Sequence, residues 1–264
     1  MDLQLKDKTA LVTGSTVGIG FAIAELLAKE GATVIINGRS QERVEHAIEE
    51  IQKKIPKAIL KATVADLGTK EGCDNVIKQF PTVDILVNNV GIYDAKQFTD
   101  ISDEEWIHFF QVNVMSGVRL SRHYLTPMLK KNWGRIIFIS SESGLQTPKE
   151  MVHYGMTKSA QISIARGIAE ATEGTQVTVN SVLPGPTMSE GVEEFIKNIG
   201  KERNLTYKEI EDDFFKTIRP TSLIKRFESS DEIANMVAFL CSPLASATTG
   251  AAIRVDGGVI RTMA

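Results

Sequence analysis

The sequence predicts an α/β domain, because short apolar runs that suit buried strands alternate with apolar residues at helical spacing. The first run, 9–13, ends in a glycine-rich turn and passes directly into an apolar helix that begins at Phe21. Later runs have the composition of strands at 33–37, 58–65, 83–87, 135–141, 176–182 and 251–255. The length of 264 residues suits one large α/β domain or two small ones.

The turn after the first strand has the features of a phosphate-binding loop. It reads Thr13-Gly14-Ser15-Thr16-Val17-Gly18-Ile19-Gly20, spaced Gly-x-x-x-Gly-x-Gly instead of the commoner Gly-x-Gly-x-x-Gly. Glycine lets the backbone turn tightly and lets a ligand approach without a Cβ in the way. The helix start offers free N–H groups and a positive dipole end to a pyrophosphate. An ordinary strand–helix loop is the alternative, but the strand–turn–helix context favours dinucleotide binding.

The end of the second strand bears on the choice of cofactor. In dinucleotide folds an acid at this point accepts from the ribose 2′-hydroxyl, whereas an arginine accommodates a 2′-phosphate. Positions 37–40 hold no acid but include Arg39, and Ser40 can N-cap the next helix. We therefore predict that NADP(H) is preferred and that NAD(H) is the alternative; Arg39 could also be a solvated loop residue. The next helix has a core stripe at Val44, Ala47, Ile48 and Ile51.

Polar residues follow the third, fourth and fifth strands. Asp66-Leu67 follows the third, Asn88-Asn89-Val90-Gly91 the fourth, and Ser141 ends the fifth. Ligands of open α/β folds bind at the carboxyl ends of strands, where paired asparagines can bridge backbone segments. Each of these features also suits an ordinary turn. Pro184-Gly185-Pro186-Thr187 closes the sixth strand, and Asp256-Gly257-Gly258 follows the last.

A long helix opens with the capping box Ser102-Asp103-Glu104-Glu105. Trp106, Phe109 and Phe110 are expected on its buried face, and Asn113 lies on the same face. A buried asparagine must find hydrogen-bond partners, so Asn113 either ties the helix to the sheet or serves a site.

Tyr154 and Lys158 lie four residues apart, on one face of a predicted helix that runs to about residue 171. A nearby cation favours the phenolate, so we expect Lys158 to lower the pKa of Tyr154 and to make it a general acid or base. This spacing alone also occurs by chance on amphipathic helices.

Residues 188–227 are charged and aromatic, with helical spacing and no strand pattern. We predict two short helices that form a lid within the domain, mobile without substrate. The apolar residues Met188, Phe195, Phe214 and Phe215 suit either an apolar roof or a small core within the lid. Ser229 and Glu232 then cap another helix.

Composition excludes several classes of protein. The net charge of −3, with acids and bases interspersed, does not suggest a nucleic-acid partner. Cys73 and Cys241 are far apart, which indicates free thiols in a reducing compartment and no metal site. We see no signal peptide and no membrane span, so the cytoplasm is the expected location.

Together these motifs resemble the short-chain dehydrogenase/reductase family over nearly the whole chain. The resemblance rests on Thr13-Gly14-x-x-x-Gly18-x-Gly20, Asn88-Asn89-Val90-Gly91, Asn113, Ser141, Tyr154-x-x-x-Lys158, Pro184-Gly185 and Asp256-Gly257-Gly258. It implies a single Rossmann domain over 1–264 with a mostly parallel seven-stranded sheet. It also implies nicotinamide-dependent interconversion of an alcohol and a ketone, commonly in a homotetramer.

The resemblance also implies roles for single residues. Tyr154 would donate the proton, Ser141 would hold the carbonyl oxygen, and Lys158 would lower the phenol pKa and bind the nicotinamide ribose. Asn113 would anchor a water that relays protons from Lys158. The expected cofactor-binding residues are Gly14, Ser15, Thr16, Gly18, Ile19 and Gly20 at the pyrophosphate, Arg39, Ser40, Asp66, Leu67, Asn88 and Gly91 toward the adenosine half, and Tyr154, Lys158, Pro184, Gly185 and Thr187 toward the nicotinamide.

Two details of the resemblance concern packing and substrate. Val90 stands where alanine is usual, and residues 127–135 resemble 3-oxoacyl-carrier-protein reductases, whereas 188–227 does not. The competing hypotheses are a non-catalytic nucleotide-sensing or scaffold protein and an epimerase or dehydratase on a related scaffold. A module that only binds nucleotide has no need of a proton donor, so the complete set of Asn113, Ser141, Tyr154 and Lys158 favours an enzyme.

Overall fold

The computed structural model describes residues 2–188, 192–193, 196 and 205–263. Its centre is a seven-stranded sheet in the order β3-β2-β1-β4-β5-β6-β9, and each neighbouring pair is parallel. The predicted α/β fold is therefore confirmed. The strands are β1 (Thr9–Val12), β2 (Thr33–Gly38), β3 (Leu60–Val64), β4 (Ile85–Asn88), β5 (Gly134–Ile139), β6 (Val177–Pro184) and β9 (Ala252–Val255).

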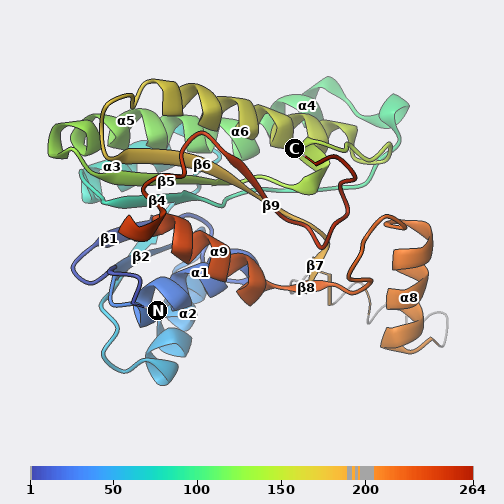
Figure 1. Cartoon of the computed structure of the whole chain (residues 1–264), viewed down its shortest axis with the longest axis horizontal. Coiled ribbons are helices and arrows are strands. Elements are labelled where there is room, and N and C mark those ends of the chain that lie inside the picture. Colours follow the sequence, from blue (N-terminus) through green and yellow to red (C-terminus); the bar gives the residue numbers. More distant parts are fainter. Residues whose placement is uncertain (1, 189–191, 194–195, 197–204, 264) are drawn as a thin grey trace.

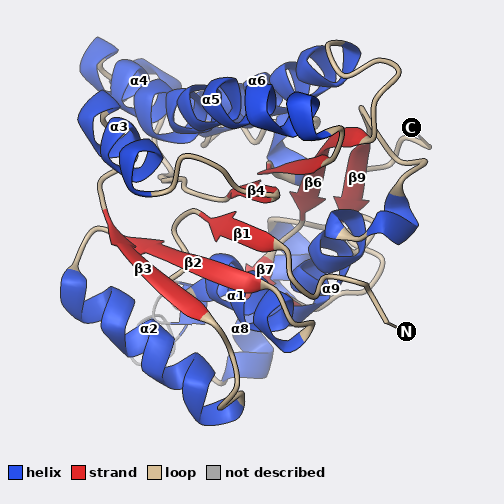
Figure 2. Cartoon of the chain, turned by 90° about the vertical axis from the view of Figure 1, so that its left-hand side faces the viewer, coloured by secondary structure: helices blue, strands red, loops and turns tan. Residues whose placement is uncertain are grey.

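Helices cover both faces of the sheet (Figures 1 and 2). One face packs against α1 (Gly18–Lys29), α2 (Gln41–Lys54) and α9 (Ser230–Cys241). The other packs against α3 (Lys70–Gln79), α5 (Ser116–Lys131) and α6 (Val152–Glu170). α4 (Asp103–Phe110) precedes α5 and is joined to it by a π-helical turn, η2 (Gln111–Met115). Short 3₁₀ turns are η1 (Phe98–Asp100), η3 (Glu142–Gly144) and η4 (Pro243–Ala245).

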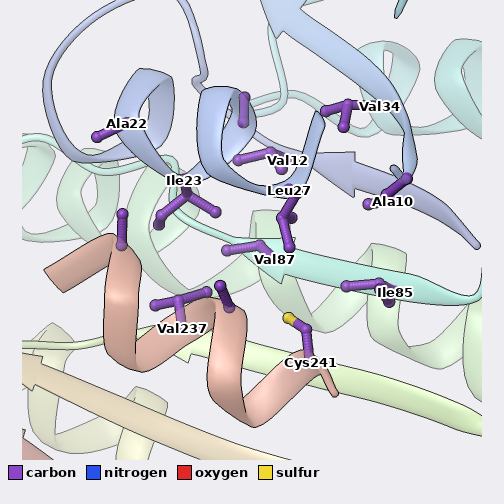
Figure 3. Packing of buried hydrophobic residues seen from close by; sticks show 14 of the residues in the cluster. Ala10, Val12, Ala22, Ile23, Leu27, Val34, Ile85, Val87, Val237 and Cys241 are labelled. Atoms are coloured by element: carbon purple, nitrogen blue, oxygen red, sulfur yellow. The ribbon is translucent and has the colours of Figure 1, made fainter. Parts of the chain in front are cut away.

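Alternate strand residues supply the two cores, which explains the apolar runs in the sequence. Ala10 and Val12 face the α1 and α9 side, whereas Leu11 faces α3 and α5. Figure 3 shows Ile23 and Leu27 of α1 between the strands and α9. Burial on both faces holds the register of β1 and thereby the position of the turn that follows it.

Three helices begin at the residues that the sequence indicated. Ser40 accepts a hydrogen bond from the Arg43 amide, and Ser102 and Ser229 each form a complete capping box. The expected burial of Phe110 is wrong: its side chain is exposed, because the buried stripe of the short helix α4 is centred on Phe109.

The segment 188–227 differs in part from its prediction. Met188 belongs to a strand, β7 (Thr187–Met188), which pairs in parallel with β8 (Glu228–Ser229), so the expectation of no strand fails there. α8 (Tyr207–Thr217) is one of the expected helices. Phe195 and much of the other predicted helix lie outside the described residues. The described apolar side chains form a cluster of their own, with Ile196, Ile210, Phe215 and Phe227 buried and Met188, Val192 and Phe214 packed against them.

Candidate active site

A cleft of about 700 Å³ opens at the carboxyl ends of the strands, where the strand order changes direction between β1 and β4. This is where ligands bind in doubly wound α/β proteins. Most of the predicted site residues line it. These are Gly14, Thr16, Gly18, Ile19, Gly20, Arg39, Ser40, Asp66, Leu67, Gly91, Ser141, Tyr154, Lys158, Pro184, Gly185 and Thr187.

The glycine turn is braced by Asn89, which the sequence offered only as half of an asparagine pair. Its Nδ2 donates to the carbonyls of Thr13 at 2.9 Å and Gly14 at 3.0 Å. Gly14 and Gly18 both have φ of +60°, which favours glycine. A Cβ on Gly20 would lie 2.3 Å from the Gly14 carbonyl oxygen and 2.4 Å from Asn89 Nδ2. The contacts around the turn therefore leave no room for a side chain at Gly20.

The start of α1 is suited to an anionic ligand. Its N-cap, Val17, provides no side-chain hydrogen bond, and the first turn contains no acid. The first N–H groups and the positive dipole end therefore face the cleft without a competing protein anion. This arrangement fits the pyrophosphate of a dinucleotide.

Asn37 and Arg43 line the cleft at the end beside β2, in addition to the predicted residues. Asn37 Oδ1 accepts from the Gly14 amide at 3.1 Å, which joins the end of β2 to the glycine turn. Arg43 lies in the first turn of α2 and shares the cleft with Arg39. The sequence offered two signals for these residues: Asn37 is a polar residue near the end of a strand, and Arg43 lies about one helical turn after Arg39.

Ser141 and Tyr154 meet at the opposite end of the cleft. Ser141 lies two residues beyond β5 and accepts from the Ser143 amide at 3.1 Å, which opens η3. Burial raises the pKa of Tyr154 to about 12, and the neighbouring Ser141 hydroxyl opposes this rise with a smaller effect. The phenol is therefore protonated at neutral pH.

The expected lowering of the Tyr154 pKa by Lys158 is not found. Burial lowers the pKa of Lys158 to about 7, so its amine is only partly protonated at neutral pH. The lysine Nζ lies 5.4 Å from the centroid of the Tyr154 ring. The helical spacing does bring the pair together, as predicted, but burial disfavours the charged form of both groups.

Ser15, Asn88 and Asn113 lie outside the cleft wall, although the sequence placed all three in the site. Ser15 Oγ accepts from the Asn37 amide at 3.0 Å, and Asn88 Nδ2 donates to Ser121 Oγ at 3.1 Å. Both are buried and brace the walls. Their position beside strand ends made them indistinguishable from lining residues in the sequence.

Asn113 ties the π-helical turn to the loop after β4. Its Oδ1 accepts from the Ile92 amide at 2.7 Å, and its Nδ2 donates to the Ile92 carbonyl and to Thr157 Oγ1. The side chain is 1% exposed and all of these bonds are within the protein. These bonds give Asn113 a tying role, and its expected part in the site stays a prediction.

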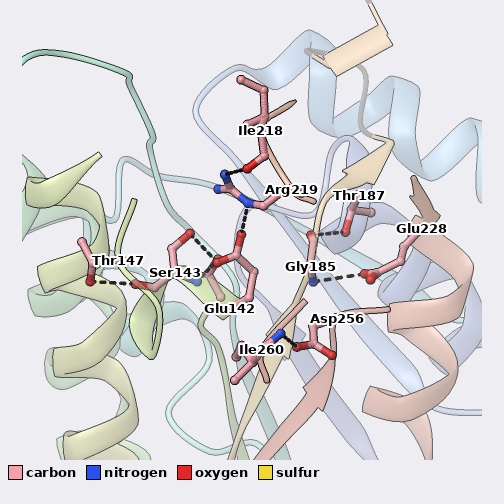
Figure 4. A network of polar contacts seen from close by, with 11 residues as sticks. Glu142, Ser143, Thr147, Gly185, Thr187, Ile218, Arg219, Glu228, Asp256 and Ile260 are labelled. Atoms are coloured by element: carbon pink, nitrogen blue, oxygen red, sulfur yellow. Dashed lines mark hydrogen bonds and ion pairs between the residues drawn. The ribbon is translucent and has the colours of Figure 1, made fainter. Parts of the chain in front are cut away.

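An ion pair joins the Ser141 end of the cleft to the segment after α8. Arg219 Nε donates to Glu142 Oε1 at 2.9 Å, and Glu142 directly follows Ser141 (Figure 4). Ser143 Oγ donates to the other carboxylate oxygen. Both charged side chains are largely buried.

A second carboxyl, Glu228, anchors the strand end that carries Thr187. Its Oε2 accepts from the Gly185 amide at 3.1 Å (Figure 4). Burial raises the pKa of Glu228 to about 8. A Cβ on Gly185 would lie 2.8 Å from both the Cα and the carbonyl oxygen of Asp256, so the backbone that follows the last strand requires glycine here.

The stretch 127–135 leads into the amino-terminal end of β5, and the cleft lies at the carboxyl ends of the strands. Arg135 is 1% exposed, and its guanidinium donates to the carbonyls of Gly134, Gln176 and Ser242. The stretch therefore packs the sheet and does not line the cleft.

None of the described helices is both long and apolar enough to cross a membrane. Within the same part of the chain, no group of three or more histidine, cysteine, aspartate or glutamate side chains could hold a metal ion.

The parallel sheet, the glycine turn at its switch point and the Ser141–Tyr154–Lys158 group define an α/β protein of the Rossmann type. A family model described as enoyl-(acyl carrier protein) reductase matches residues 14–260. The chain belongs to the short-chain dehydrogenase/reductase family.

Relatives and solved structures agree with this membership. The oxidoreductase YvaG of Bacillus subtilis is 52% identical over 100% of both chains. A 3-oxoacyl-[acyl-carrier-protein] reductase of Aquifex aeolicus is 36% identical over 98% of this chain and 100% of its own. L-Sorbose reductase from Gluconobacter frateurii, complexed with NADPH and L-sorbose, superimposes with a TM-score of 0.93 at 31% identity over 100% of both chains. The chain is an oxidoreductase of this family, and a nicotinamide cofactor fits its cleft.

Proposed function

We propose that the protein interconverts a ketone and a secondary alcohol by hydride transfer with NADP(H), with Tyr154 as the proton donor. The observation that carries the proposal is that Ser141 and Tyr154, whose hydroxyls are close enough for Ser141 to lower the Tyr154 pKa, line the same cleft as the glycine turn. A carbonyl oxygen between these hydroxyls would meet two donors as it gains negative charge.

The cleft residues divide the remaining tasks. Gly14, Gly18 and Ile19 would bind the pyrophosphate, and Gly185 and Thr187 would border the nicotinamide, which supplies or accepts the hydride when bound. The phenol of Tyr154 is protonated at neutral pH, which is the form needed to reduce a carbonyl. A second donor on the oxyanion, Ser141, contributes about 3 kcal/mol by comparison with other oxyanion sites.

We propose NADP(H) as the preferred cofactor because two arginines line the adenosine end. Arg39 and Arg43 can each offer a planar, charged donor group to a 2′-phosphate, and Ser40 adds the start of α2. NADPH is also the cofactor in the L-sorbose reductase complex. A charged hydrogen bond is worth about 1.5–3 kcal/mol, so we expect a preference of roughly ten- to a hundredfold from Arg39.

The cofactor proposal is tested by kcat/KM with NADPH and NADH. Arg39→Ala and Arg43→Ala should each lower the NADPH to NADH ratio, with Arg39→Ala the more damaging. Lys53→Ala, which removes a cation at the far end of α2, is the matched control and should leave the ratio unchanged. A parent enzyme that prefers NADH would overturn the proposal.

The reaction itself is tested by a turnover screen with both cofactors. L-sorbose and other ketoses, 3-oxoacyl thioesters, cyclic ketones and steroids should include at least one compound that the enzyme reduces with NADPH. If NADPH binds but no carbonyl compound is reduced and no alcohol is oxidised, the chain is a nucleotide-binding module and the proposed reaction is wrong.

A further inference from the structure

The side chain of Gln161 joins the cleft lysine to the π-helical turn. Lys158 Nζ donates to Gln161 Oε1 at 3.2 Å, and Gln161 Nε2 donates to the main-chain oxygen of Asn113 at 2.6 Å. Gln161 is 1% exposed and lies one turn after Lys158 on α6. Both ends of its amide are therefore used within the protein.

The main-chain carbonyl of Asn113 belongs to the π-helical turn, whose position is held by hydrogen bonds. The asparagine side chain holds this turn to Ile92 and to Thr157 on α6. π-helical turns interrupt the regular i→i−4 ladder and are frequent at functional sites. The acceptor that anchors Gln161 thus belongs to a turn that is tied down on two sides.

A second bond completes the positioning of the lysine. Lys158 Nζ also donates to the carbonyl of Ile139, at the end of β5, at 2.9 Å. An ammonium has three N–H donors, so this bond and the one to Gln161 leave one for the cleft that Lys158 lines.

We propose that Gln161 is a positioning residue, whose amide fixes Lys158 Nζ between β5 and the π-helical turn so that the remaining N–H donor points to the cofactor and Tyr154. The proposal rests on the proposed function for its catalytic consequence, while its geometric part concerns Lys158 alone.

The chemistry of an amide suits this position better than either alternative. Gln161 Oε1 accepts a hydrogen bond from the ammonium and from the neutral amine, so Lys158 keeps its place in both protonation states, while only the ammonium has the third N–H for the cleft. A glutamate would add a charge that raises the lysine pKa, which burial now lowers to about 7. An apolar side chain would leave the buried Asn113 carbonyl without this donor.

The charged surroundings allow the effect on Lys158 to be isolated. Tyr154 is the titratable group beside it on α6, and Glu142 from η3 and Arg219 after α8 act on Tyr154. These groups remain in both test variants, so a change in the Lys158 pKa can be assigned to the replacement of the Gln161 amide.

Two variants and one control test the proposal. Gln161→Met keeps the length of the side chain and removes both hydrogen bonds, whereas Gln161→Glu keeps the acceptor and adds charge. Gln79→Met is the control, because Gln79 also bridges two groups, Thr63 Oγ1 and the Ala62 carbonyl, away from the cleft. The readouts are kcat and KM with NADPH and an active carbonyl substrate, and the titration of Lys158 followed by NMR of its labelled ε-carbon.

We expect Gln161→Met to lower kcat about tenfold with KM for the carbonyl substrate little changed, since one hydrogen bond is worth about 1 kcal/mol or slightly more. Gln161→Glu should move the Lys158 titration at least about one pH unit upward. Gln79→Met should change neither quantity. If the folded Gln161 variants titrate and turn over like the parent, the positioning role is wrong. If the parent has no reductase activity, the proposed function fails, and the Lys158 titration alone decides whether Gln161 positions the amine.

Discussion

Burial sets the protonation of two acids that the sequence could not distinguish from exposed ones, Tyr154 and Glu228. Each loses water around its charged form, so the pKa rises to about 12 for the phenol and to about 8 for the carboxyl. The spacing of Tyr154 and Lys158 in the sequence correctly predicted their proximity. It did not reveal that Lys158 would be buried and Tyr154 partly buried, because burial depends on the elements that pack over them.

Tyr154→Phe should keep the fold and NADPH binding but lower turnover at least about a hundredfold, because only the proton donor is lost. Tyr93→Phe is the matched control: Tyr93 lines the same cleft, with its ring centroid 6.4 Å from that of Tyr154. Steady-state kinetics should show the control within a few-fold of the parent. Equal kcat values for Tyr154→Phe and the parent would remove Tyr154 from the reaction.

Glu228→Gln should make the protein more stable toward alkaline pH. The folded-state pKa is raised from 4.5 to about 8, so the stability that neutral Glu228 provides is full below pH 4.5 and is lost as pH rises through about 8. The Tm difference between the variant and the parent should therefore grow from pH 5 to pH 9.

Glu232→Gln is the control for this titration. The Arg226 guanidinium lowers the pKa of Glu232 to about 2, so its stability contribution is present above pH 4.5 and is lost only as pH falls through about 2. Its Tm difference from the parent should be constant between pH 5 and pH 9. A similarly constant difference for Glu228→Gln would show that the buried carboxyl does not titrate in this range.

At the scale of single elements, the sequence indicated helix starts better than it indicated interruptions. Ser40, Ser102 and Ser229 are capping residues with a local chemical signature, and each one begins its predicted helix. The π-helical turn has no such signature, because the partners of Asn113 lie on the loop after β4 and on α6. The pairing of β7 with β8 was missed for a similar reason: two residues on each side give no alternating pattern.

The ion pair between Arg219 and Glu142 links two elements whose charges act on Tyr154 in opposite directions. Glu142 raises the Tyr154 pKa, whereas Arg219 lowers it. Arg219→Ala should therefore move the alkaline limb of the kcat/KM profile for alcohol oxidation to higher pH, and Glu142→Gln should move it lower. Arg219→Ala should also lower Tm more, because it leaves a buried carboxylate without its cation. Shifts of the same sign in both variants would contradict this account.

At the scale of the whole molecule, the position of the cleft was predictable because it follows from topology. Parallel strands bring Gly14, Asp66, Gly91 and Ser141 to one edge of the sheet, although they are distant in sequence. The lining by Asn37 and Arg43, and the exclusion of Ser15 and Asn88, depend on the direction of single side chains. Neither composition nor spacing determines that direction.

The predicted homotetramer can be tested on α4, which exposes apolar side chains. Ile107 is 61% exposed and Phe110 38% exposed, one helical turn apart. Ile107→Glu should reduce the mass measured by light scattering, because a charge would be buried against a second copy. Ile59→Glu, at an isoleucine that is also 61% exposed, should leave the mass of the parent unchanged. A parent that is monomeric at micromolar concentration would refute the prediction.

The parallel register also has a consequence for how the chain acquires its structure. β1 pairs with β4 through Ala10 and Ile85, and β6 pairs with β9 through Ser181 and Ala252. Both pairings join residues that are more than 70 positions apart in the sequence, 10 with 85 and 181 with 252. The entropy of closing these long loops is lost before the strand contacts stabilise the chain, so the contact order is high and we expect slow folding. Gly14 follows β1 and Gly185 follows β6, so the cleft that they line is complete only after these pairings form. A nascent chain exposes apolar strand edges until then, which makes the interval before β9 docks the period of greatest risk of aggregation.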